Sequence, residues 1–262
     1  MKVLYYAYQI LISPLLLLLT LLTALATIVG CRVGNAAFWS YYPGKLWSQA
    51  MIRLLFLPVK VEGREHMDPQ QSYIFIPNHQ GAFDIFLVYG FLNRPFKWML
   101  KSELRRMPFI GKACESAGFI FVDQKGGPRK IKETHDRARQ VLQGGVSLVV
   151  FPEGARTWDG RLRKFKRGAF QLATELQLPL LPITINGSFE VLPRSKGYVN
   201  LVNWHPLTMT IHPAITPPAP SEDAAQNTET ERVMMHQAYD IINGSLKTKP
   251  IEPEEGTYNP ED

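Results

Sequence analysis

The sequence lacks the patterns that would place it in several common classes. Its 262 residues include two cysteines, Cys31 and Cys114, with no CxxC spacing, which excludes a disulfide scaffold and a cysteine zinc site. It has no GxGxxG, GxxxxGK[ST], GxSxG or HExxH pattern, so nothing supports a dinucleotide fold, a P-loop, an α/β-hydrolase elbow or a zinc protease. A mean hydropathy of −0.10 excludes a transporter with many membrane spans.

Charge is also missing from one long stretch near the N-terminus. No charged residue lies between Lys2 and Arg32, and this run exceeds the ~20 residues needed to cross a bilayer. It is also about twice as long as the apolar region of a signal peptide, so we expect a retained anchor although Ala24-Leu25-Ala26 resembles a cleavage site. Pro14 should kink or break this helix, which could then span the membrane or dip into one leaflet.

The residues after this run indicate a membrane interface. Tryptophan and tyrosine lie on both sides of Lys45 between positions 38 and 47, and such aromatic residues beside a basic one are typical of bilayer surfaces. Apolar residues recur at helical spacing over 46–57, which predicts an amphipathic helix that lies on the membrane or packs on the folded domain.

Acidic residues are concentrated at the C-terminal end. The chain carries a net charge of +6, whereas residues 221–262 hold ten acids and three bases, a net charge of −7. Residues 1–220 therefore carry +13. A basic body behind an apolar anchor favours lipid headgroups and phosphate esters as partners rather than nucleic acid, and predicts that the body faces the cytoplasm.

Strand and helix patterns alternate from position 59 onward. Strands are expected at 59–62, 72–76, 96–100, 119–122, 146–151, 180–185, 199–202 and 207–211, and helices at 83–92, 128–143, 168–177 and 228–246. The alternation predicts an α/β fold with a mixed, mostly parallel sheet flanked by helices. We divide the chain into an anchor with an interfacial helix (1–57), an α/β domain (58–220) and an acidic C-terminal helix with a disordered tail from 251 (221–262).

One histidine has the surroundings of a general base. His79 directly follows an expected buried strand, and Asp84 comes five residues later near the start of a helix. Open α/β sheets bind ligands at the carboxyl ends of their strands, and the turn lets the Asp84 carboxylate reach the imidazole and fix its tautomer. Of the six histidines only His79 has an aspartate at this spacing. A loop histidine beside a helix-capping aspartate is the alternative reading.

A second cluster follows the apolar run 146–151. Glu153 and Arg156 come next in the chain, and the planar guanidinium of Arg156 suits a phosphate; a structural ion pair between the two is the alternative. Five bases follow between 161 and 167, which predicts headgroup contacts or a solvated loop. Lys101 directly follows the expected strand 96–100 at the same sheet edge. Pro182 lies inside the expected strand 180–185, where an edge or a bulge would tolerate it; a plain core strand is the alternative.

Five motifs lie behind the anchor in the order NHxxxxD (78–84), KxEL (101–104), GxIFVD (118–123), FPEGxR (151–156) and LPxxI (181–185). Their order resembles that of the glycerolipid acyltransferase superfamily. The most similar family is that of the 1-acylglycerol-3-phosphate O-acyltransferases, over about residues 55–215. The resemblance implies a glycerol-3-phosphate acyltransferase-like fold. It also implies an enzyme that moves a fatty acyl group from acyl-CoA or acyl-carrier protein to the sn-2 hydroxyl of 1-acyl-sn-glycerol 3-phosphate, forming phosphatidic acid for phospholipid biosynthesis.

The resemblance also implies roles for single residues and for partners. By it, the general base is His79, oriented by Asp84; the acceptor phosphate lies at Arg156, Lys101, Glu153 and Gly154; and Pro182 is linked to the acyl donor. It implies no metal and no cofactor beyond the acyl thioester. The implied partners are the bilayer, lysophosphatidic acid and the donor, with no nucleic acid, and the implied location is the cytoplasmic side of a membrane, the bacterial inner membrane.

Two positions depart from the family pattern. Gln124 stands where the third motif commonly has arginine, which Lys125 or Arg129 could replace, and FPEG continues with alanine rather than threonine. The first departure leaves open another lysolipid acceptor, such as a lyso-aminolipid. A membrane-surface lipid-binding protein without activity and an acyl hydrolase are further alternatives. For a transfer reaction, we expect backbone N–H groups of the Gln80-Gly81 turn or the Gly154 loop to stabilise the oxyanion.

Overall fold

The computed structural model describes residues 2–123, 126–194 and 201–251. Within these ranges one seven-stranded sheet has the order β1-β7-β6-β2-β5-β3-β4. Its strands are β1 (Val59–Glu62), β2 (Ile74–Pro77), β3 (Phe96–Lys101), β4 (Ile120–Val122), β5 (Ser147–Val149), β6 (Leu180–Asn186) and β7 (Leu207–Ile211). Strands β6, β2, β5, β3 and β4 run parallel, whereas β7 is antiparallel to β6 and β1 runs with β7.

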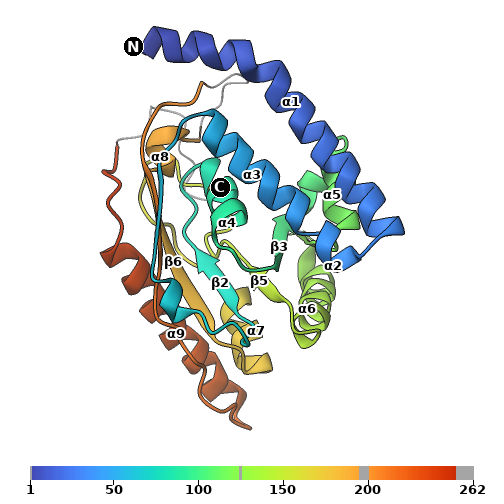
Figure 1. The fold of residues 1–262 in the computed structure, drawn as a ribbon. Helices are drawn as coiled ribbons and strands as arrows, with labels where there is room; N and C mark the ends of the chain where they lie inside the picture. Colours follow the sequence, from blue (N-terminus) through green and yellow to red (C-terminus); the bar gives the residue numbers. More distant parts are fainter. Residues whose placement is uncertain (1, 124–125, 195–200, 252–262) are drawn as a thin grey trace.

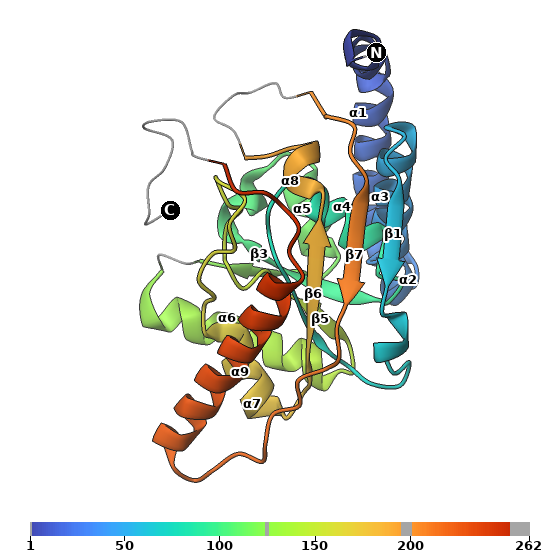
Figure 2. The ribbon, with the colours of Figure 1, turned by 90° about the vertical axis from the view of Figure 1, so that its left-hand side faces the viewer.

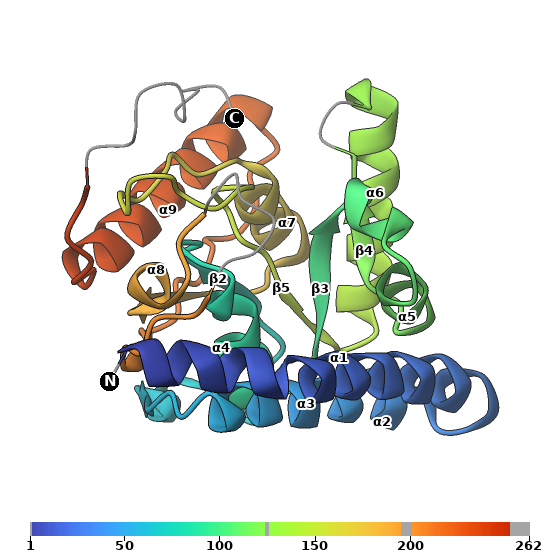
Figure 3. The same ribbon diagram turned by 90° about the horizontal axis from the view of Figure 1, so that it is seen from above.

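Helices cover both faces of this sheet (Figures 1 and 3). They are α1 (Lys2–Val33), α2 (Ala36–Trp39), α3 (Tyr42–Leu54), α4 (Phe83–Phe91), α5 (Ile110–Ser116), α6 (Gly127–Gln143), α7 (Gly168–Leu176), α8 (Ser188–Val191) and α9 (Ala224–Gly244), with short 3₁₀ turns at Arg64–His66 and Ser102–Arg106. Along β2, Phe75 enters the apolar core shared with α3 and α4, whereas Ile74 and Ile76 enter the core shared with α6, α7 and α9. This alternation follows from the two-residue period of a strand. The expected fold class is confirmed.

Some expected elements differ in the structure. We expected a strand at 199–202, of which the structure describes residues 201 and 202. Neither residue belongs to a strand, because the main chain of Val202 bonds the side chain of Gln9 instead. The outer edge of β7 is occupied by β1. Residues 252–262, where we expected a disordered tail, lie outside the described residues. Helix α5 was not predicted, since it covers only two turns.

Helix α1 is docked on the body of the protein rather than projecting from it. It continues through Pro14 without a break and changes direction along its length (Figures 1 and 2). Near its start, the Tyr5 hydroxyl donates to the Leu55 carbonyl at 2.7 Å, and the buried Gln9 side chain bonds both main-chain groups of Val202. These contacts hold the first turns of α1 against the loop after α3 and the segment before β7.

The other end of α1 packs just as closely. The ring of Trp39 lies directly on Gly30, where a Cβ would come within 2.1 Å of the ring, so only glycine fits there. The indole N–H of Trp47 in α3 donates to Thr20 at 3.0 Å. Helix α3 itself buries Met51 and Ile52 on the domain. The helix expected at 46–57 is therefore present, shifted toward the N-terminus, and one of its faces packs on the domain.

The outward face of α1 remains apolar and exposed. The helix is long and apolar enough to cross a bilayer, and 11% of its most hydrophobic window is buried. Its exposed side chains include Leu4, Leu11, Leu18 and Leu25. Such a continuous apolar face on a docked helix indicates association with a membrane.

Candidate active site

His79 and Asp84 form a hydrogen-bonded pair at the carboxyl end of β2. The turn after Pro77 places His79, and Asp84 occupies the first turn of α4. The imidazole Nδ1 lies 2.8 Å from the Asp84 Oδ2, and the side chains are 14% and 0% exposed. A buried carboxylate on Nδ1 leaves Nε2 as the acceptor of a proton. The structure therefore has the geometry that the spacing of the two residues predicted.

The turn itself fixes the carboxylate. The backbone N–H groups of Gln80 and Gly81 donate to the same Asp84 oxygen, at 2.7 and 2.9 Å. Since both groups already have an acceptor, the expectation that they stabilise an oxyanion is not supported. The Gly154 N–H, the other candidate, donates to the Phe151 carbonyl at 3.0 Å. Both sets of donors instead build the turns that carry the site.

Aromatic stacking fixes the plane of the imidazole. The His79 ring stacks on Phe151 with centroids 3.9 Å apart and an interplanar angle of 13°, and Phe151 stacks in turn on Trp98. Phe151 comes from the loop after β5, so the strand beside β2 supplies one wall of the site. The stack and the Asp84 bond together leave the imidazole little rotational freedom.

Glu153 is buried beneath the site rather than facing an acceptor. The residue is 3% exposed. Its Oε1 accepts a hydrogen bond from the His79 backbone N–H at 2.5 Å, and its Oε2 accepts one from the Arg163 backbone N–H at 2.8 Å. Burial raises the pKa of Glu153 to about 8, against the lowering effect of these bonds. Residues 150–167 between β5 and α7 form a loop that we call the basic loop. The geometry gives Glu153 a positioning function, because its side chain bonds both the turn that carries His79 and the Arg163 end of the basic loop.

Basic side chains gather around the loop that carries Arg156. Gly154 there has φ +73°, a left-handed conformation that favours glycine. The carbonyl of Arg156 accepts from the guanidinium groups of Arg163 and Arg194, at 3.4 and 3.3 Å. Arg194 also lies over the Trp158 ring at 3.9 Å. Two guanidinium groups thus bond the main chain at Arg156, and arginine-rich loops of this kind suit an anion.

Lys101 lies in this basic region as well. It is the last residue of β3, at the same sheet edge as His79. The pKa of Lys166 is lowered by partial burial and then by the positive charges of Lys101 and Arg163. From the sequence, Arg163 and Lys166 belong to the basic run expected to contact headgroups or to form a solvated loop, and Arg194 lies in no motif.

Pro182 lies inside the sheet, away from the site edge. It is buried, and it pairs in register with Ile76 on β2. The segment forms the plain core strand that was the alternative to an edge or a bulge, since β6 is an interior strand. Its neighbour β7 pairs only from Ile183 onward, and the Pro182 carbonyl accepts from His212. The missing N–H of the proline therefore breaks no ladder bond, and its link to the acyl donor stays a prediction.

The third motif is only partly described. Gln124 and Lys125 lie outside the described residues, and Arg129 is 83% exposed on α6 beside Glu133. Within the described ranges no group of three or more histidine, cysteine, aspartate or glutamate side chains is arranged to hold a metal ion.

Comparison with known proteins identifies related sequences. The sequence profile of the Acyltransferase family matches residues 58–186. The chain is 32% identical to the 1-acyl-sn-glycerol-3-phosphate acyltransferase LPAT1 of Arabidopsis thaliana over 61% of this chain and 45% of that protein. It is 37% identical to the alpha form from Mus musculus over 49% and 45% of the two chains. A relative from Limnanthes douglasii is 27% identical over 87% and 73%.

A solved structure has the same fold. The 1-acyl-sn-glycerophosphate acyltransferase PlsC from Thermotoga maritima superposes with a TM-score of 0.69 at 22% identity, covering 94% of this chain and 98% of that one. The similarity in fold therefore includes the N-terminal helices. The chain spans less than half the length of the first two curated relatives.

Proposed function

Because residues 58–186 match the sequence profile of the Acyltransferase family, we propose that the protein acylates the sn-2 hydroxyl of 1-acyl-sn-glycerol 3-phosphate to form phosphatidic acid. The observation that carries the proposal is the His79–Asp84 pair at the sheet edge that also holds the basic loop of Arg156. The related proteins named as 1-acyl-sn-glycerol-3-phosphate acyltransferases support the choice of acceptor.

The chemistry follows from which atoms of His79 are occupied. With Nδ1 held by Asp84, Nε2 takes the proton from the acceptor hydroxyl as its oxygen attacks the thioester carbonyl. The new C–O bond forms, the C–S bond of acyl-CoA or acyl-carrier protein breaks, and the thiolate leaves with the proton returned by His79. Binding of the acceptor phosphate near Arg156 holds the hydroxyl in place. The proposed route uses no resident metal or cofactor.

Arg156→Ala is expected to raise the KM for lysophosphatidic acid by about 10- to 100-fold with a smaller effect on kcat, because it removes a charge-assisted bond to the phosphate. Steady-state kinetics with varied acceptor at saturating donor measure it. Arg232→Ala is the matched control, since Arg232 is exposed on α9 and paired with Glu229. An unchanged acceptor KM in Arg156→Ala would remove Arg156 from the phosphate site.

The proposed function is tested by an acceptor panel with purified protein in lipid vesicles. Release of free thiol from acyl-CoA or acyl-carrier protein is measured with lysophosphatidic acid, with a lysolipid that lacks an accessible phosphate monoester, and with no acceptor. We expect release to depend on lysophosphatidic acid. A preference for a lyso-aminolipid, as Gln124 allows, would change the acceptor; release without acceptor would indicate a hydrolase; and no release would indicate a binding protein.

We also propose that α1 lies along the surface of the membrane on its cytoplasmic side, in a bacterium the inner membrane. Bonds at Tyr5 and Gln9 near one end, and contacts with α3 and α5 further along, hold α1 to the domain. A helix held this way cannot stand across the bilayer while the docking persists. The exposed leucines would then enter one leaflet.

Spin labels along α1 test this geometry. Single labels replacing Leu11, Leu18 and Leu25, which are 78%, 52% and 56% exposed, are expected to report similar shallow depths in vesicles. A label replacing Val233 on α9, which is 54% exposed, serves as the aqueous control. Depths that increase to the bilayer centre and fall again along the series would show a spanning helix.

A further inference from the structure

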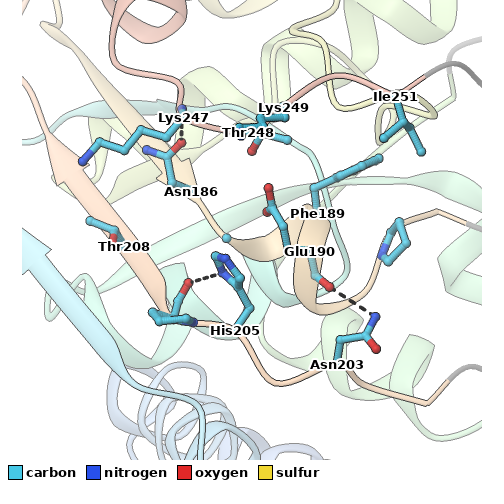
Figure 4. Close-up of a pocket in the computed structure, with 13 residues that line it drawn as sticks. Asn186, Phe189, Glu190, Asn203, His205, Thr208, Lys247, Thr248, Lys249 and Ile251 are labelled. Atoms are coloured by element: carbon cyan, nitrogen blue, oxygen red, sulfur yellow. Dashed lines mark hydrogen bonds between the residues drawn. The ribbon is translucent and has the colours of Figure 1, made fainter. Parts of the chain in front are cut away.

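The segment after α9 crosses the carboxyl edge of the sheet beside the catalytic turn. We call residues 245–251 the C-terminal strap. The strap is tied to the end of β6, where the Asn186 side chain bonds the Ser245 carbonyl and the Lys247 N–H. It is tied to the basic loop, where the Ile251 N–H donates to the Asp159 carbonyl at 2.9 Å. Lys247, Thr248 and Ile251 of the strap line a cavity of about 630 Å³. Figure 4 shows these residues along one side of it.

Between these two ties, the strap reaches the residue next to His79. The Thr248 hydroxyl donates to the side-chain Oε1 of Gln80 at 2.7 Å, and the Gln80 Nε2 donates to the Gly160 carbonyl at 2.7 Å. Thr248 is 8% exposed and Gln80 is fully buried. The Gln80 side chain is therefore held from two directions, by the strap and by the basic loop.

Gln80 connects this clamp to the catalytic pair. It follows His79 directly in the chain, and its own N–H donates to the Asp84 oxygen that binds the imidazole. The next residue, Gly81, is packed so tightly that a Cβ would lie 2.2 Å from the Ser188 carbonyl. A turn confined this closely transmits a shift of the Gln80 side chain to the position of its backbone N–H, and so to Asp84 and His79.

We propose that Thr248 is a positioning residue for the His79–Asp84 pair, acting through Gln80, so that the C-terminal strap sets the rate of the reaction. The inference rests on the proposed function of His79 as general base. Loss of the hydroxyl leaves the buried Oε1 of Gln80 without its donor, and the turn relaxes away from the geometry that transfer needs. Catalysis is sensitive to such displacements even when the altered residue does not touch the substrate.

The test compares Thr248→Val, which keeps the shape and removes the hydroxyl, with Thr248→Ser, which keeps the hydroxyl. We expect Thr248→Val to lower kcat about 10-fold with acceptor and donor KM values within about 2-fold of wild type, and Thr248→Ser to restore most of kcat. Thr228→Val is the matched control, because Thr228 is an exposed threonine on α9. Kinetics are measured well below the unfolding midpoint of each variant.

Two further measurements separate positioning from a loss of fold. Hydrogen exchange of the peptide covering residues 78–84 should speed up in Thr248→Val, while peptides from β6 and α7 keep their protection. In a double-mutant cycle, Gln80→Ala should remove the effect of Thr248→Val on kcat, because the threonine acts through that side chain.

The outcomes also distinguish this inference from the proposed function. Thiol release by wild type that depends on acceptor supports the function whatever Thr248 does. A Thr248→Val variant with wild-type kcat and unchanged exchange at 78–84, or effects on kcat that simply add in the cycle, would overturn the positioning role. If wild type shows no transfer, the exchange measurement still decides whether the strap holds the turn.

Discussion

His79→Ala is expected to lower the rate of acyl transfer by about 10²- to 10⁴-fold, the usual contribution of a positioned general base. The reason is geometric: Nδ1 is bonded to a fully buried Asp84 at 2.8 Å, so the ring presents Nε2 to the acceptor. The variant should still fold, because the His79 side chain makes a ring stack and one bond but fills no large core position. Its KM values should stay close to those of wild type.

Asp84→Asn should lower the rate of acyl transfer by at least 10²-fold. In wild type one charged oxygen of Asp84 accepts hydrogen bonds from the imidazole Nδ1–H and from two backbone N–H groups, and a neutral amide cannot replace it. The control is His236→Ala, an exposed histidine on α9, which should keep full activity. Unfolding curves and kcat are measured for all three variants. Near-wild-type kcat in both His79→Ala and Asp84→Asn would contradict the assignment of base and orienting residue.

Glu153→Ala is expected to destabilise the protein by about 2–5 kcal/mol, because it removes a buried side chain and leaves two backbone N–H groups without an acceptor. These are the N–H groups of His79 and Arg163, so activity should fall together with stability. Glu153→Gln should cost less, since one side-chain oxygen remains to accept. Chemical denaturation at fixed pH measures the difference in the free energy of unfolding.

The same residue predicts how stability depends on pH. Burial raises the pKa of Glu153 to about 8 in the folded protein, from the ordinary 4.5. Between these pH values the folded protein keeps a proton on Glu153 that the unfolded chain releases. The contribution of Glu153 to the free energy of unfolding is therefore fully present below about pH 4.5 and is lost as the pH rises through about 8. Glu153→Gln should remove this slope, whereas the exposed Glu133→Gln should retain it. Equal slopes for wild type and Glu153→Gln would contradict the raised pKa.

The sequence was most informative where one local pattern decides the structure. The periodicity of apolar residues predicted most strands of the sheet and most of the helices that flank it. The spacing of His79 and Asp84 predicted the contact between these two side chains, because only a short turn separates them. The run from Lys2 to Arg32 predicted an apolar helical segment that is kinked or broken at Pro14, and the structure has one helix that continues through Pro14. It did not predict that this helix docks, since its bonds run from Gln9 to Val202 and from Tyr5 to Leu55.

Contacts between distant segments account for what was missed. The resemblance implied an acceptor-binding role for Glu153 and a link to the acyl donor for Pro182, and both roles stay predictions. The sequence did not show that Glu153 is buried on two backbone amides or that Pro182 lies within the sheet. Arg194 and Thr248 belong to no motif, and only the fold brings them beside the loops that they contact. The backbone donors of Gln80 and Gly81 were assigned to an oxyanion because their use by Asp84 is invisible in a sequence.

The central claim is tested most directly by locating the transferred acyl group. Purified protein is given a labelled acyl thioester and 1-acyl-sn-glycerol 3-phosphate, and the product is cleaved selectively at each glycerol position. The account predicts phosphatidic acid labelled at sn-2, formed by wild type and lost in His79→Ala. Label recovered only as free fatty acid, or phosphatidic acid formed equally well by His79→Ala, would contradict it.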